Sequence, residues 1–179
     1  MKKLLACTVS LAVLAAAPAR AALQPGAKAP DFTAPGALGG NEFTFSLKEA
    51  LKKGPVVLYF YPAAFTSGCT IEAHEFAEAA DDYKKLGATL IGVTAGNTNR
   101  LVEFSKSECR SKFATAAVTT KIIKSYDAVL AEYPDWSDRT SYVIAPTGEI
   151  VFTYSNPDPS KHVEETLGAL KKWKDAHGS

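Results

Sequence analysis

This sequence has no excess of charge of one sign, because its 20 lysine and arginine residues are balanced by 19 aspartate and glutamate residues. A formal net charge of +1 produces no strong field, so we expect neither nucleic acid nor an anionic membrane as a partner. Histidine is also scarce, and His74, His162 and His177 show no paired ligand spacing. The sequence therefore predicts no metal site, and we expect no bound cofactor.

Long apolar runs are absent except near the start of the chain. Two lysines precede an uncharged, mostly apolar run over residues 4–17, and the small-residue motif Ala19-Arg20-Ala21 follows. This pattern predicts a secretory signal peptide over residues 1–21, cleaved before Ala22. The run is too short to span a bilayer as a helix, and an uncleaved anchor is the alternative. We expect a periplasmic or secreted protein without membrane contact after cleavage.

Cysteine occurs three times, at Cys7, Cys69 and Cys109. Signal cleavage removes the first and leaves two thiols in an oxidising compartment, where an even pair invites a disulfide. The C-x-x-C motif of dithiol exchange proteins is absent, because Glu72 stands where a second cysteine would follow Cys69. Dithiol exchange is therefore not the expected main activity.

Hydrophobic periodicity predicts the order strand, helix, strand, helix, hairpin, helix after a Pro- and Gly-rich lead-in over residues 23–40. The predicted strands are residues 42–45, 56–61, 89–94, 141–145 and 149–154. The predicted helices are a short one capped by Ser46, one from Thr66 to Leu86, one over 97–108, and a terminal one through Val163 and Trp173. We therefore expect one α/β domain over residues 22–179, with a mixed central β-sheet flanked by helices on both faces, as in a thioredoxin-like fold.

The chemically informative stretch lies where the second predicted strand gives way to the long helix. Cys69 falls in the first helical turn, where unpaired backbone N–H groups and the helix dipole favour a thiolate. Thr66 is placed to cap the helix and to present its hydroxyl on the same side as the sulfur. Pro62 has no N–H and a fixed ring, which suits the wall of a small pocket. The alternative is a simple turn and cap around a buried cysteine.

Pro62, Thr66 and Cys69 match the P-x-x-x-T-x-x-C signature of the peroxiredoxins, and the surrounding residues resemble the Q-type branch of that family. The similarity continues through residues 26–32, 90–94 and 139–150. It implies that Arg139 stabilises the thiolate and the departing oxygen. The alternative is that Arg139 is a surface residue paired with Asp138.

The resemblance implies a thiol-dependent peroxidase. The thiolate of Cys69 would attack the distal oxygen of hydrogen peroxide or an alkyl hydroperoxide, leaving a sulfenic acid. An external thiol, either small or carried by a thioredoxin-like or glutaredoxin-like protein, would be the reductant. Q-type relatives are often monomeric, so a monomer is expected.

The sequence departs from the family pattern in the predicted helix that contains Cys69. Many Q-type members carry a second cysteine five residues after the first, but this chain has His74 there, which we expect to be a solvated helix residue. Cys109 is then the candidate resolving cysteine; an inert buried thiol and a one-cysteine route are the alternatives. Glu72 either helps to orient the site, as the resemblance implies, or only complements the helix dipole.

A different class of function also remains open from the residues. The chain would then be a non-enzymatic thioredoxin-like module, binding or protecting other proteins, with a static disulfide between Cys69 and Cys109.

Overall fold

The computed structural model describes residues 22–177, so the predicted signal peptide lies outside the described residues. Its centre is a seven-stranded sheet in the order β2-β1-β5-β4-β3-β8-β9. The strands are β1 Thr33–Leu38, β2 Asn41–Ser46, β3 Val56–Phe60, β4 Thr89–Thr94, β5 Ala114–Ala117, β8 Thr140–Ile144 and β9 Ile150–Ser155. Only β3, β4 and β5 run parallel to one another, and the other neighbouring pairs are antiparallel.

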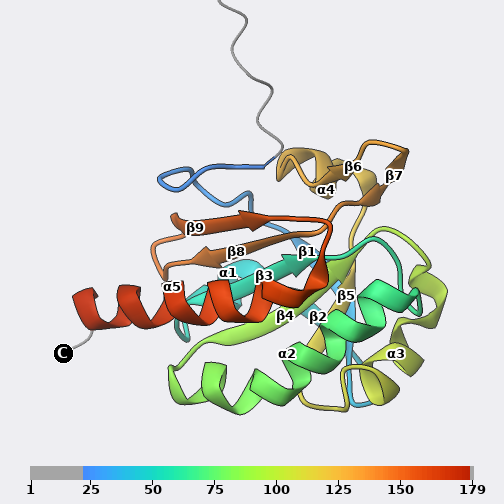
Figure 1. The fold of residues 1–179 in the computed structure, drawn as a ribbon, viewed down its shortest axis with the longest axis horizontal. Helices are drawn as coiled ribbons and strands as arrows, with labels where there is room; N and C mark the ends of the chain where they lie inside the picture. Colours follow the sequence, from blue (N-terminus) through green and yellow to red (C-terminus); the bar gives the residue numbers. More distant parts are fainter. Residues whose placement is uncertain (1–21, 178–179) are drawn as a thin grey trace, which may run out of the picture.

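Helices cover both faces of this sheet. They are α1 Leu47–Leu51, α2 Ser67–Lys85, α3 Leu101–Ser107, α4 Thr120–Ser125 and α5 His162–His177, with short 3-10 turns η1 Thr98–Arg100 and η2 Pro159–Lys161. Helices α2, α3 and α5 supply one core, and α1 and α4 supply the other (Figure 1). A ribbon of β6 Val129–Leu130 and β7 Tyr133–Ser137 stands apart from the main sheet. The expected α/β, thioredoxin-like fold with a mixed sheet is confirmed.

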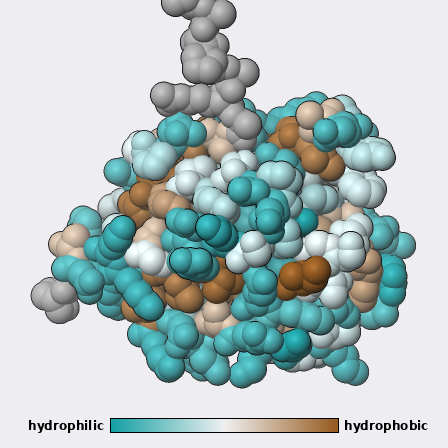
Figure 2. All heavy atoms as spheres, viewed as in Figure 1, coloured by the Kyte–Doolittle hydropathy of each residue, from teal (hydrophilic) through white to brown (hydrophobic). Residues whose placement is uncertain are grey.

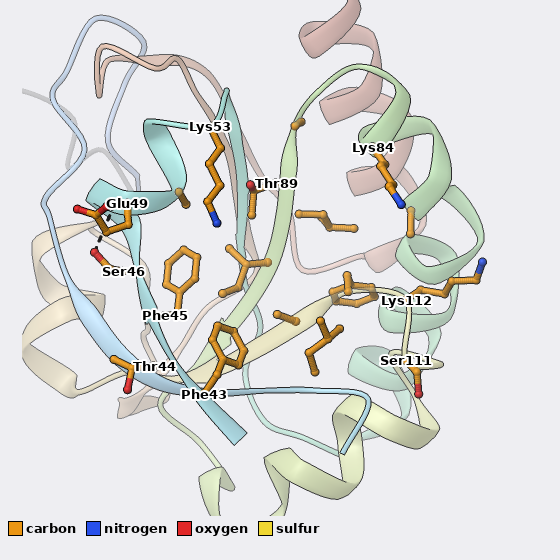
Figure 3. A pocket seen from close by; sticks show the side chains of 18 of the residues that line it. Phe43, Thr44, Phe45, Ser46, Glu49, Lys53, Lys84, Thr89, Ser111 and Lys112 are labelled. Carbon is orange, nitrogen blue, oxygen red and sulfur yellow. Dashed lines mark hydrogen bonds between the residues drawn. The ribbon is translucent and has the colours of Figure 1, made fainter. Parts of the chain in front are cut away.

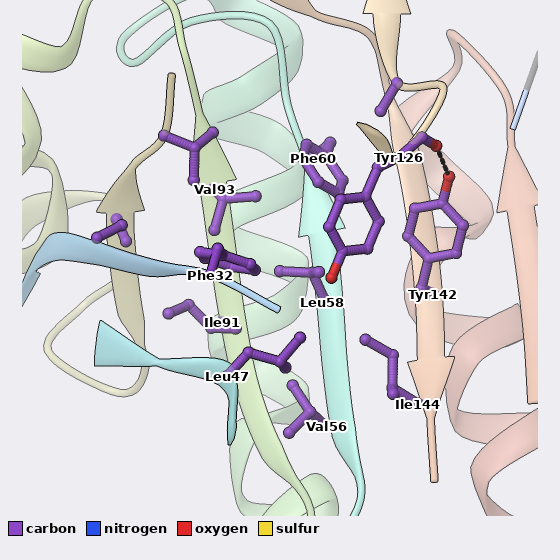
Figure 4. Packing of buried hydrophobic residues seen from close by; sticks show 14 of the residues in the cluster. Phe32, Leu47, Val56, Leu58, Phe60, Ile91, Val93, Tyr126, Tyr142 and Ile144 are labelled. Atoms are coloured by element: carbon purple, nitrogen blue, oxygen red, sulfur yellow. Dashed lines mark hydrogen bonds between the residues drawn. The ribbon is translucent and has the colours of Figure 1, made fainter. Parts of the chain in front are cut away.

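Strand β3 shows why the sheet needs both layers of helices. All five of its residues are buried, and successive side chains point to opposite faces. Val56, Leu58 and Phe60 enter the core beneath α1 and α4 (Figure 4), whereas Val57 and Tyr59 enter the core beneath α2, α3 and α5. The uninterrupted apolar run is therefore a strand with no solvent-facing side.

The described surface differs from this interior. The face shown in Figure 2 is mostly hydrophilic, with hydrophobic residues in separate small groups. Among residues 22–177, no helix combines the length and apolar character needed to cross a bilayer.

Most predicted elements are present with nearly the predicted bounds. Ser46 caps α1 by accepting a hydrogen bond from the Glu49 amide, and Gly87, in the left-handed region at φ 73°, follows the last turn of α2. Strand β1 was not predicted, because its Thr-Ala-Pro-Gly-Ala-Leu sequence lies within the expected lead-in. Strand β5, helix α4 and the β6–β7 ribbon were also missed.

Candidate active site

The loop that joins β3 to α2 is held by Thr94, the last residue of β4, and by the residues that follow it. The hydroxyl of Thr94 donates to the carbonyl of Pro62 (2.9 Å), and the side-chain amide of Asn97 donates to the carbonyl of Ala64 (3.1 Å). Gly96 lies so close beneath that a Cβ on it would be 2.3 Å from the Pro62 oxygen. A residue without a side chain is therefore required where the two loops touch.

A sharp turn then brings the chain into the helix. Phe65 has a positive φ of 65°, a strained value for a side chain of this size. Its ring is fixed on two sides, by the Arg100 guanidinium 3.8 Å from the ring centroid and by an edge contact with Phe104. The packing of the ring thus stabilises the turn that directs Ser67 into the first turn of α2.

Cys69 lies in that first turn, and its residue is only 1% exposed. The nearest charged group is the Arg139 guanidinium, whose Nη2 is 3.7 Å from the Cys69 sulfur. Gly68 makes this approach possible, because a Cβ there would stand 3.0 Å from the same Nη2. The helix N-terminus and a buried cation therefore act on one sulfur, and both favour the thiolate.

Arg139 is a buried residue just before β8, so the alternative of a surface residue paired with Asp138 is wrong. Its Nε donates to the Pro157 carbonyl (3.0 Å), and its Nη1 is paired with the Glu72 carboxylate. Burial by itself would lower the pKa of Arg139, but the charges of Glu72 and Cys69 raise it above its ordinary value. The guanidinium is thus held by three partners in a fixed orientation.

Thr66 and Pro62 lie beside the sulfur in the chain but differ in exposure. Thr66 is exposed, and its hydroxyl donates to the Ala63 carbonyl (3.1 Å). The expected side-chain cap is wrong: Thr66 occupies the N-cap position, yet its side chain makes no capping bond to the helix. Pro62 is half-buried. Of the predicted site residues, Arg139 contacts the Cys69 sulfur, while Thr66 and Pro62 belong to the loop between β3 and α2.

Glu72 is fully buried one turn beyond Cys69, so it does more than complement the helix dipole. Burial raises the pKa of Glu72 to about 8, although Arg139 acts in the opposite direction. Its Oε2 meets Arg139, whereas its Oε1 is buried without a hydrogen-bond partner and lies 3.7 Å from Nδ1 of His162. The Glu72 carboxyl group thus holds Nη1 of the guanidinium, while Nη2 faces the sulfur.

His162, at the start of α5, is buried next to the Glu72 carboxyl group. Its Nε2 bonds to the Asn156 carbonyl (3.0 Å), so this nitrogen carries the proton and Nδ1 accepts from Ser141 (2.8 Å). Burial lowers the pKa of His162 to about 4. The imidazole is therefore neutral and acts as a hydrogen-bonded support.

This buried imidazole predicts a loss of stability in acid. In the unfolded chain the ring takes up a proton near pH 6.5, but in the folded protein only near pH 4, so its contribution is complete above pH 6.5 and declines as the pH falls. The decline reaches up to about 3 kcal/mol in the free energy of unfolding. Urea denaturation at pH 7, 5.5 and 4.5 measures it. The pH slope should flatten in His162→Gln and stay unchanged for the exposed His177→Gln; equal slopes in all three proteins contradict the assignment.

Cys109 follows α3 and is buried in the same hydrophobic cluster as Cys69. Both are free thiols, and burial raises the pKa of Cys109 well above its ordinary value. The two residues after it, Arg110 and Ser111, have positive φ values of 48° and 56°. The structure thus places a protonated, unreactive thiol immediately before a strained turn.

Three ion pairs attach this turn to one face of α2. His74 pairs with Glu108 (2.8 Å), and the other two pairs are Arg110 with Glu78 and Lys112 with Asp81. His74 is a partly solvated helix residue, with 37% of its side chain exposed, and its ring also contacts Glu108. Partly exposed pairs of this kind contribute at most about 1 kcal/mol each.

Sequence reasoning missed several residues that support the site. Ser137 donates to the Tyr61 carbonyl (2.8 Å) and accepts from the Ala95 amide, which links three loops. Thr94 was predicted only as part of a strand, and His162 was considered only as one of three histidines without metal-ligand spacing. Thr94 is polar at the end of an apolar strand, but Ser137 and His162 stand among polar residues and give no such signal, and the partners of all three are distant in the chain. Among residues 22–177, no group of three or more His, Cys, Asp or Glu is arranged to hold a metal ion.

Comparison with known proteins gives consistent results. The profile of the AhpC/TSA family matches residues 25–153. Peroxiredoxin Q, chloroplastic, of Oryza sativa subsp. japonica is 31% identical over 147 residues, which are 82% of this chain and 66% of the relative. The protein of the same name from Gentiana triflora is 32% identical over 152 residues, 84% of this chain and 68% of the relative. The chain thus spans about two thirds of the length of these relatives.

Solved structures share the fold. Peroxidoxin BcpB from Mycobacterium tuberculosis superposes with a TM-score of 0.74 at 24% identity, covering 84% of this chain and 97% of that one. The reduced 2-Cys peroxiredoxin of Plasmodium vivax gives 0.77 at 21% identity, covering 88% and 100%. Since the family profile spans most of the described residues and the relatives are peroxiredoxins, this chain belongs to the AhpC/TSA family and is a peroxiredoxin of the Q type.

Proposed function

We propose that this protein is a thiol-dependent peroxidase that reduces hydrogen peroxide and alkyl hydroperoxides at Cys69. The observation that carries the proposal is the contact of 3.7 Å between the Cys69 sulfur and the Arg139 guanidinium, at the N-terminus of a helix. A thiolate formed beside these two groups is a nucleophile, and the guanidinium retains N–H donors for a second anion.

The first step is attack of the Cys69 thiolate on the distal peroxide oxygen. The S–O bond forms as the O–O bond breaks; sulfur is oxidised to a sulfenic acid, and the leaving oxygen takes a proton to depart as water or an alcohol. Arg139 is placed to stabilise the negative charge as it moves from sulfur to the leaving oxygen. Glu72 and the Pro157 carbonyl restrain the guanidinium, so little reorganisation is needed.

Thr66 and Pro62 are proposed to receive the peroxide. Because the Thr66 hydroxyl donates to the Ala63 carbonyl, its oxygen remains free to accept a hydrogen bond from the peroxide O–H. Pro62 adds an apolar wall without a donor. Both residues belong to the exposed or half-exposed loop directly before the buried sulfur, the side from which a small molecule approaches.

We propose Cys109 as the resolving cysteine. Its thiol would displace hydroxide from the sulfenic acid to give a disulfide and water. This step requires the first turn of α2 and the turn after Cys109 to rearrange, because both thiols are buried. The positive φ angles of Arg110 and Ser111 and the three weak surface ion pairs favour such a rearrangement, since strain is released and little binding energy is lost.

Mass spectrometry of the reduced protein after one equivalent of peroxide tests this function. The expected product has lost two hydrogens within one chain, with Cys69 joined to Cys109. Cys109→Ser should instead gain one oxygen on Cys69, which dimedone traps as the sulfenic acid. A wild-type protein that keeps both thiols contradicts the peroxidase proposal, whereas sulfenic acid without a disulfide contradicts only the role of Cys109.

The alternative module with a static disulfide is not favoured, because both cysteines are free. We further propose an external thiol as the final reductant, as peroxiredoxin chemistry requires a source of two electrons. Export through residues 1–21 is proposed from their charged, apolar and small-residue segments. A monomeric state stays a prediction, which light scattering of the purified protein measures.

A further inference from the structure

A groove of about 620 Å³ lies on the opposite part of α2 from the sulfur. It is bounded by β2 and α1 on one side and by the last turns of α2 on the other (Figure 3). Ala80, which lines it, is roughly 16 Å along the helix axis from Cys69, at about 1.5 Å rise per residue. The groove is therefore separate from the proposed peroxide site, and its volume suits a small-molecule ligand.

The floor of the groove is apolar. Phe45, Ile91 and Phe113 are buried beneath it, whereas Phe43 at its edge is 39% exposed. The apolar surface open to solvent is therefore at the edge of the groove, where Phe43 and Leu38 (43% exposed) line it, and covering these side chains with a hydrocarbon chain would be favourable.

The charges around the groove are unevenly paired. Both lining carboxylates are occupied: Glu49 by Lys52 (2.6 Å) and Asp81 by Lys112 (3.2 Å). Lys53 and Lys84 also line the groove, and neither forms an ion pair with any described residue. Figure 3 shows these two ammonium groups at the same end as Thr89, with Phe43 and Ser111 at the other end. One end carries two unpaired ammonium groups, and the other end includes the exposed ring of Phe43 next to polar side chains such as Thr44 and Ser111.

We propose that this groove binds an amphiphilic monoanion of the fatty-acid class. The carboxylate would lie at the end formed by Lys53 and Lys84, and the hydrocarbon chain would extend over the floor toward Phe43. A neutral apolar molecule would leave the two lysines unused, and a compact inorganic anion would leave the apolar floor uncovered. A ligand that combines both parts meets the two unpaired lysines and covers the exposed apolar edge.

Fluorescence titration of the purified protein with cis-parinaric acid tests the proposal, with laurate and dodecanol as competitors. We expect saturable binding of one molecule per chain, displaced by laurate and at least about tenfold less effectively by dodecanol. The double variant Lys53→Gln/Lys84→Gln should weaken binding about tenfold, because each partly exposed ion pair contributes about threefold to fivefold. Phe43→Ser, at the exposed edge, should also weaken it.

Matched controls separate this site from other causes. Lys85→Gln removes a neighbouring lysine that pairs with Asp82 and does not line the groove, so affinity should be unchanged. Cys69→Ser should bind equally well, because the groove is independent of peroxide chemistry. The proposal is overturned by the absence of saturation, by dodecanol competing as well as laurate, or by Lys85→Gln weakening binding as much as the double variant.

Discussion

Replacing Cys69 by serine should reduce peroxide consumption by at least about a thousandfold. The substitution exchanges one atom in a buried first turn, so packing changes little, but a serine hydroxyl stays protonated where a thiol ionises. It also lacks the accessible oxidation states on which a sulfenic acid depends. The measurement is loss of hydrogen peroxide with dithiothreitol as the reductant, followed under steady-state conditions.

Cys109→Ser is the matched control for this experiment, because it removes the other buried thiol. With a small thiol as reductant it should keep the rapid first turnover, since dithiothreitol reaches the sulfenic acid directly. Substantial activity in Cys69→Ser, or equal loss in both variants, would show that the reactive sulfur has been misassigned.

Arg139→Met should lower the second-order rate constant with peroxide by about a hundredfold to a thousandfold, the cost of losing a preorganised donor. The variant should also be less stable by about 1–3 kcal/mol, because it leaves the buried Glu72 carboxyl group without its hydrogen-bond partner. Stopped-flow fluorescence measures the rate constant, and urea denaturation measures the free energy of unfolding.

The double variant Glu72→Gln/Arg139→Met separates these two effects. A neutral amide needs no cation, so much of the lost stability should return, whereas the rate constant should stay low. If the double variant also recovers the rate, Arg139 acts only by maintaining the fold. If Arg139→Met retains the wild-type rate, the guanidinium does not stabilise the reacting oxygen.

The sequence predicted those parts of the fold whose signals are local. The run from Val56 to Phe60, the capping position of Ser46 and the hairpin around Gly148 all depend on residues close in the chain, and each element is present. Strand β5 has the sequence Ala-Thr-Ala-Ala, which has little strand preference, and it forms because β1 and β4 lie on either side of it. Such elements are specified by their neighbours and not by their own composition.

The candidate site shows the same division. Cys69, Thr66 and Pro62 are grouped by one motif, and Arg139 was added by resemblance. The location of Glu72 beneath the guanidinium, and of His162 beneath Glu72, depends on contacts between α2, β8 and α5 that no short spacing reveals. The missing side-chain cap at Thr66 is instead a local difference, because its hydroxyl donates to the Ala63 carbonyl three residues earlier and accepts no bond from the helix.

Gly68 imposes a restriction on which sequences this helix start can tolerate. The space that a side chain would occupy there is filled by the Arg139 guanidinium, an atom group from 71 positions later in the chain. Ser67 beside it is exposed, but a Cβ on Gly68 would press on this guanidinium, which would have to move by a few tenths of an ångström from its place beside the sulfur. The smallest residue of the first turn thereby leaves room for the counter-ion of its most reactive one.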